Sequence, residues 1–184
     1  MNFEFVPAVT PGLFNATRDA WQTQLRENPE NTSETYYSAG LAYLERALDG
    51  GVFGADGAGG LSAVVENGNS FASALIVISH AKAKTDDAYL KMLNIYVQPN
   101  LNLADSEPNY AELAWIAANA IVGGLGLTYK HYPSRQLKIH TVFPLDKEFL
   151  TAVMTVMMRE REFSQNYDVS FHANWLVVTK KDVM

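Results

Sequence analysis

Cysteine is absent from the 184 residues of this chain. Its absence excludes disulfides, thiolate metal sites and cysteine nucleophiles. Charge is also scarce, because only 18% of the residues are charged whereas 48% are hydrophobic, as in folded globular proteins. The first residues, MNFEFVPAVTPG, contain neither a basic segment nor a long apolar run, so we expect no signal peptide and a cytoplasmic protein. The length predicts a single domain over residues 1–184.

Positive charge is neither abundant nor clustered. The net charge is −6, and no basic stripe occurs that would predict a nucleic-acid partner. The most apolar stretch, residues 113–127, is shorter than a membrane span and contains Asn119 and three glycines, so it predicts a buried core helix and no membrane contact. The four histidines show no i, i+4 ligand pair, and we expect no metal site.

Hydrophobic periodicity predicts an α+β fold. The dipeptide Asn67-Gly68 is typical of a two-residue hairpin turn. A meander of three strands followed by a strand–helix–strand crossover predicts a mixed, mostly antiparallel sheet with helices on both faces, and places strand 136–142 beside strand 88–98. The predicted strands cover residues 2–6, 61–66, 71–81, 88–98, 136–142 and 174–178, and the predicted helices cover residues 10–25, about 31–48, 109–122 and 146–161.

This order of elements resembles the GNAT family of N-acetyltransferases over most of the chain. The segment MLNIYVQP is similar to the fourth strand of that family, QLKIHTV to its fifth strand, and REFSQNYDVSFHANWLVVTKK to its closing segment. The resemblance implies a GNAT-like fold and acetyl-CoA as cofactor. It also implies that the cofactor contacts the backbone near Tyr96, Val97 and Gln98, and that Asn102 takes the first position of the loop that binds the pyrophosphate.

The loop after the fourth strand departs from the family pattern. Asp105 and Glu107 stand where the family has glycines, and these carboxylates would repel a pyrophosphate. Ser106, or the pair Asn109 and Glu112, has the spacing of a helix cap that needs no ligand. We interpret the loop as a self-capped helix start, and a reshaped loop that still holds the cofactor remains the alternative.

The catalytic residues also depart from the family pattern. The resemblance implies a tyrosine acid on the helix after the fifth strand, but residues 146–161, DKEFLTAVMTVMMRER, contain no tyrosine. Tyr96 on the fourth strand is our candidate acid, and His140 on the fifth strand is our candidate base near neutral pH. A half-buried strand aromatic and a histidine bonded to sheet backbone are the respective alternatives.

Three functions stay open at this point. The first is an acetyl-CoA-dependent N-acyltransferase with a divergent cofactor loop and an amine acceptor. The second is a non-catalytic GNAT-like protein-interaction module, phage-encoded and either host-modulating or virion-associated, whose acidic N-terminal third and surface aromatics would contact a protein partner. The third is an unrelated α+β binding domain. Enzymatic activity is left open, as is assembly into a homo-oligomer or a larger complex.

Overall fold

The computed structural model describes residues 2–27, 34–50, 58–101, 110–141 and 147–181. A seven-stranded sheet of order β1-β2-β3-β4-β5-β7-β6 forms its centre. Neighbouring strands are antiparallel except β4 and β5, which run parallel as the predicted crossover requires. The strands are β1 (Phe3–Val6), β2 (Ala58–Glu66), β3 (Ala74–Ala81), β4 (Tyr89–Val97), β5 (Gln136–His140), β6 (Tyr167–His172) and β7 (Trp175–Lys180).

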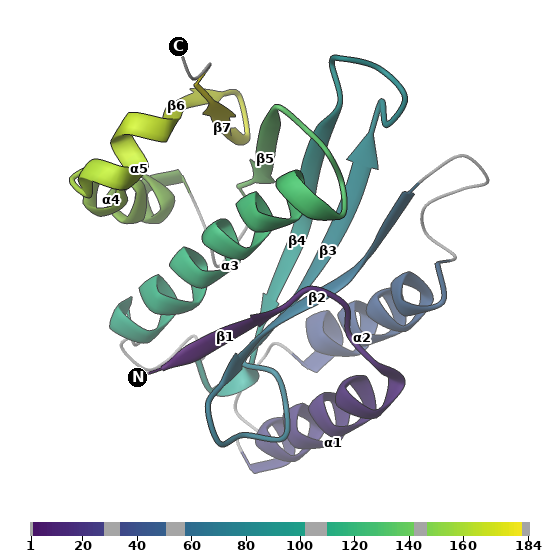
Figure 1. Ribbon diagram of the computed structural model, residues 1–184. Helices are drawn as coiled ribbons and strands as arrows, with labels where there is room; N and C mark the ends of the chain where they lie inside the picture. The colour runs from purple at the N-terminus through teal and green to yellow at the C-terminus, as the bar shows by residue number, and fades with distance from the viewer. Residues whose placement is uncertain (1, 28–33, 51–57, 102–109, 142–146, 182–184) are drawn as a thin grey trace.

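Helices cover both faces of this sheet (Figure 1). The helices α1 and α2 lie on one face, and α3, α4 and α5 lie on the other. Each face therefore has its own hydrophobic core, and the predicted α+β class with a mixed, mostly antiparallel sheet is confirmed. The helices are α1 (Pro11–Glu27), α2 (Glu34–Leu48), α3 (Tyr110–Lys130), α4 (Lys147–Met157) and α5 (Arg161–Asn166), and a short 3-10 turn covers Pro99–Leu101.

The aromatic side chains of α1 and α2 hold the first of these cores together. Trp21 is fully buried, and its indole N–H donates a hydrogen bond of 3.0 Å to the carbonyl of Ala72. Tyr37 is also buried and packs edge-on against Trp21, with ring centroids 5.9 Å apart. Both rings therefore belong to the core and are not among the surface aromatics expected to contact a partner.

The helix α3 is longer than the predicted 109–122, because it continues through a glycine-rich segment to Lys130. A Cβ at Gly123 would overlap the ring of Phe5 on β1, and a Cβ at Gly124 would overlap the end of Met92 on β4. These glycines let the helix approach the sheet closely and do not end it. By length and composition α3 could cross a membrane, but half of its apolar window is buried inside the fold, as in the core helix of a globular domain.

Two further boundaries differ from the predictions. The turn after Asn67 is longer than two residues, because the ends of β2 and β3 meet at the pair Val64 and Ala74 while residues 65–66 of β2 pair with β1. Near the C-terminus, the predicted helix 146–161 ends at Met157, and α5 and the additional strand β6 follow. β6 pairs with β7 as an antiparallel hairpin.

Candidate functional site

The parallel strands β4 and β5 separate along their length. They pair from Tyr89 with Gln136 to Met92 with Ile139, after which β5 ends at His140 whereas β4 continues to Val97. The last residues of β4 pair only with β3 among the residues that the structure describes. The edge of β4 that faces β5 therefore has no strand partner beyond Met92 among the described residues.

A β-bulge marks the point of separation. Met92 pairs with Ile78 and Asn94 pairs with Val77, which leaves Leu93 as the extra residue of β4. Bulges bend a strand and change the direction of the residues that follow. The bulge lies next to the last pair between β4 and β5, so it positions the end of β4 away from β5.

The alternation of hydrogen bonds shows which backbone groups face the gap between β4 and β5. Gln98 N–H donates to the Ser73 carbonyl at 2.9 Å, toward β3. In an antiparallel ladder the pairing alternates, so the backbone groups of Tyr96 also point toward β3, whereas those of Ile95 and Val97 point into the gap. The sequence prediction named Tyr96, Val97 and Gln98, of which Val97 faces the gap. Ile95 also faces it, and this depends on the pairing register, which could not be read from the sequence.

The side chain of Tyr96 lies against α2. Its ring centroid is 5.6 Å from that of Tyr36, and a Cβ at Gly40 would be 2.6 Å from its Cε1 atom. Burial, with a smaller contribution from Tyr43, raises the pKa of the Tyr96 hydroxyl above its usual value. Burial also raises the pKa of Tyr36 to about 12, with Tyr96 as the second cause. Both hydroxyls keep their protons near neutral pH and can donate hydrogen bonds there.

Val97 and Gln98 are held by side chains from several helices. The carbonyl of Val97 accepts a buried hydrogen bond of 2.9 Å from the Tyr37 hydroxyl. The side-chain oxygen of Gln98 accepts from Gln24 on α1 at 3.3 Å, and its amide nitrogen donates to Glu112 on α3 at 3.4 Å. The end of β4 is thus fixed from both helical layers.

His140 lies at the end of β5, on the other side of the gap. Its ring packs on Trp175 of β7, with centroids 4.8 Å apart and planes tilted by 36°. Its position is one residue beyond the last pair of β4 and β5, and Tyr96 is four residues beyond it. The two candidate catalytic residues therefore border the same gap, and each has its own aromatic partner. Asn102, Asp105 and Glu107 lie outside the described residues.

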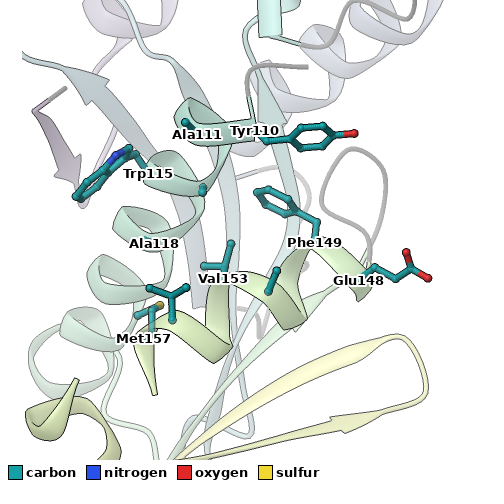
Figure 2. A pocket seen from close by; sticks show the side chains of 11 residues that line it. Tyr110, Ala111, Trp115, Ala118, Glu148, Phe149, Val153 and Met157 are labelled. Carbon is teal, nitrogen blue, oxygen red and sulfur yellow. The ribbon is translucent and has the colours of Figure 1, made fainter. Parts of the chain in front are cut away.

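A groove of about 650 Å³ runs between α3 and α4 on the opposite face of the sheet (Figure 2). Tyr110 and Trp115 from α3 and Phe149 and Met157 from α4 line it, and Trp115 is 55% exposed. Glu148 is the charged residue among its lining side chains within the described part of the chain. The groove therefore offers a large apolar surface and a negative charge.

The same groove continues along α3 toward α5. Met157 lines both this hollow and a second one of about 520 Å³, which Val122 and Tyr129 of α3 also border. Glu160 and Glu162 stand beside the second hollow. Val122 and Tyr129 are 56% and 57% exposed. The two hollows together, the α3 groove, are lined by exposed apolar side chains and by carboxylates.

No protein-family profile matches the chain, and no curated protein matches it in sequence. Three solved structures similar to it are an acetyltransferase from Agrobacterium tumefaciens (13% identity, TM-score 0.45), a protein assigned to the GNAT acetyltransferase family from Desulfovibrio desulfuricans (12%, 0.44) and the N-acetyltransferase PseH from Campylobacter jejuni (11%, 0.39). The alignments cover 99%, 97% and 98% of this chain and 94%, 97% and 98% of those chains, respectively. At TM-scores below 0.5 these likenesses do not place the chain in a family.

Proposed function

We propose that this protein is a GNAT-like N-acyltransferase that holds the pantetheine arm of an acyl thioester in the gap between β4 and β5. The observation that carries the proposal is the separation of these two parallel strands after Met92 and Ile139. It leaves the backbone groups of Ile95 and the N–H of Val97 directed into the gap, where they can bond the amides of an extended ligand, whereas the Val97 carbonyl already accepts from the Tyr37 hydroxyl. Such an edge recognises a chain of amides without any special side chain.

The described residues suit the pantetheine arm better than the nucleotide of coenzyme A. A diphosphate needs cations or free N–H groups, whereas Asp105 and Glu107 precede α3 in the sequence and Glu112 lies in its first turn. We therefore expect the nucleotide to add little to the affinity, and we derive no contact for the diphosphate.

Two residues that border the gap would take different roles in acyl transfer, one as the base and one as a hydrogen-bond donor. A bound acyl thioester supplies the electrophilic carbonyl and a thiolate leaving group. His140 would take a proton from the attacking amine, and Tyr96 would donate a hydrogen bond to the thiolate. The raised pKa of Tyr96 keeps the proton on its oxygen, which favours donation of a hydrogen bond over complete proton transfer.

Calorimetric titration with acetyl-CoA, CoA and acetyl-pantetheine tests the proposed binding site. We expect micromolar binding of acetyl-CoA, worth about −8 kcal/mol. Acetyl-pantetheine should bind within about tenfold of that affinity, since a nucleotide without cationic partners contributes little. If neither thioester binds, the proposal is wrong.

The role of His140 has its own test once an acceptor amine is known. His140→Ala should lower turnover and leave the affinity for acetyl-CoA unchanged, because the ring borders the gap without holding the thioester. His131→Ala is the matched control, since His131 is exposed beyond the end of α3. Equal turnover in the two variants would remove His140 from the mechanism.

A non-catalytic protein-interaction module is the second candidate function, and the α3 groove favours it. Five large apolar side chains are exposed along α3 and α4, a surface that soluble proteins use for contacts with other molecules. Substitution of Trp115 and Val156 by serine should remove contact with a partner and leave acetyl-CoA binding intact. The five residues are Tyr110, Trp115, Val122, Tyr129 and Val156.

A further inference from the structure

Half of one sheet face is not covered by helices in the described part of the chain. The helices α1 and α2 pack over β2 and β3, whereas β5, β7 and β6 carry no helix on that face (Figure 1). A hollow of about 460 Å³ lies there. Its side chains come from β4, β5, β6 and β7, which places residues far apart in the sequence on a single surface.

Two lysines lie side by side on neighbouring strands in this hollow. Lys91 of β4 and Lys138 of β5 are direct partners in the parallel ladder, so their side chains leave the same face of the sheet at the same level. Like charges directly opposite each other destabilise a sheet. Neither lysine forms an ion pair with a carboxylate among the described residues.

Aromatic rings take the place of carboxylates beside these lysines. Lys138 Nζ lies 3.9 Å from the ring centroid of Tyr89, and Lys91 Nζ lies 5.4 Å from the same ring. Lys91 Nζ also lies 5.8 Å from the ring of Trp175. A ring attracts a cation without cancelling its charge. The hollow therefore keeps two adjacent positive charges in a protein whose net charge is −6.

The other groups that face the hollow are hydrogen-bonding side chains. His172 Nε2 lies 3.1 Å from the Ser170 hydroxyl, so its ring is oriented at the edge of the hollow. Asp168 is on the same strand, but it lies 3.3 Å from Lys181 and is not among the lining residues. The hollow thus combines cations, donors and the half-buried indole of Trp175, without a carboxylate of its own within the described residues.

We propose that this hollow, the Lys91–Lys138 site, binds a phosphate monoester whose apolar or planar part rests on Trp175. A phosphate monoester carries a charge of about −1.5 to −2 at neutral pH, which matches two ammonium groups better than a single carboxylate does. Lysine binds phosphate as a point charge, so it does not need the planar fork of arginine. The site adjoins the proposed thioester gap, because Trp175 packs against His140, and binding of a phosphate there goes beyond the proposed acyl transfer.

Titration with small aryl anions tests both the charge and the ring. The probes are phenyl phosphate, benzenesulfonate, which carries the same ring with a single charge, and inorganic phosphate, which carries no ring. We expect phenyl phosphate to bind more tightly than either of the others and to change the tryptophan fluorescence of the protein. Equal affinity for phenyl phosphate and benzenesulfonate, or no saturable binding of phenyl phosphate, would overturn the proposal.

Substitution of the lysines locates the binding. Lys91→Gln and Lys138→Gln should each weaken phenyl phosphate binding by about tenfold or more, because each removes one charge-assisted contact. Lys91→Gln should leave the melting temperature unchanged or higher, since it also relieves the repulsion between the lysines. Lys130→Gln, an exposed lysine at the end of α3, is the control and should leave the affinity unchanged. If all three variants bind alike, the anion binds elsewhere.

Discussion

Substitution of Gly123 by alanine tests how closely α3 is packed on the sheet. Gly123 lies over Phe5 of β1, and an added Cβ would overlap the phenyl ring. Gly126 lies one turn further along the same helix, and a Cβ there would meet nothing. The two glycines therefore differ in their surroundings while they share a helix interior.

The expected magnitude follows from two opposing effects. In a helix interior alanine is more favourable than glycine by about 1 kcal/mol, and this gain applies at both positions. At Gly123 the ring of Phe5 must move, and overpacking of this kind costs about 1–3 kcal/mol. We therefore expect Gly123→Ala to lower the free energy of unfolding by about 1 kcal/mol, which for a chain of this length lowers Tm by about 2–4 °C.

Thermal and denaturant unfolding of both variants provide the measurement. Gly126→Ala should raise the free energy of unfolding by about 0.5–1 kcal/mol, because alanine has the higher helix propensity and its Cβ would meet no other atom there. In a Phe5→Ala background, Gly123→Ala should also become stabilising, since the ring that it displaces is gone. If Gly123→Ala stabilises the wild-type protein as much as Gly126→Ala does, α3 is not packed tightly against Phe5 at this position.

Two further predictions concern the tyrosines around the end of β4. Tyr37→Phe leaves the buried carbonyl of Val97 without its 2.9 Å hydrogen bond, so the free energy of unfolding should fall by about 1–3 kcal/mol in urea titration; an unchanged value would show that the bond does not form. Tyr36 ionises with a pKa of about 12 in the fold and about 10 when unfolded, so its contribution to stability is present below pH 10 and is lost as the pH rises from 10 to 12. Comparison of the wild type with Tyr36→Phe by absorbance titration should locate this late ionisation, and a normal pKa in the difference curve would contradict it.

The sequence predicted the elements whose patterns are local. The alternation in residues 88–98 and the crossover to residues 136–142 were sufficient to place β4 beside β5. The end of α3 was wrong because glycine was interpreted as a stop, whereas Gly123 and Gly124 are packing positions whose partners are distant in the sequence. The sequence left open whether Phe171 belongs to the last strand or to one before it, because the apolar residues of β6 pack against a core that exists only after the chain has folded.

The candidate site was predictable only in part. The residues around Tyr96 could be located by a strand motif, but the identity of the backbone groups that face the gap depends on the pairing register with β3. The pairing of Lys91 with Lys138 has the same origin, since two lysines 47 positions apart become neighbours only through the register of β4 and β5. A single sequence contains no pattern that predicts the pairing of these two lysines.

The side-chain amide of Gln98 forms hydrogen bonds with both helical layers. It connects Gln24 of α1, on one side of the sheet, with Glu112 of α3, on the other. A ligand that enters the gap beside β4 and turns this one side chain would break both hydrogen bonds together. Occupancy of the gap would then be communicated to the two helical layers at once, and the surfaces of α1 and α3 could report on the same event.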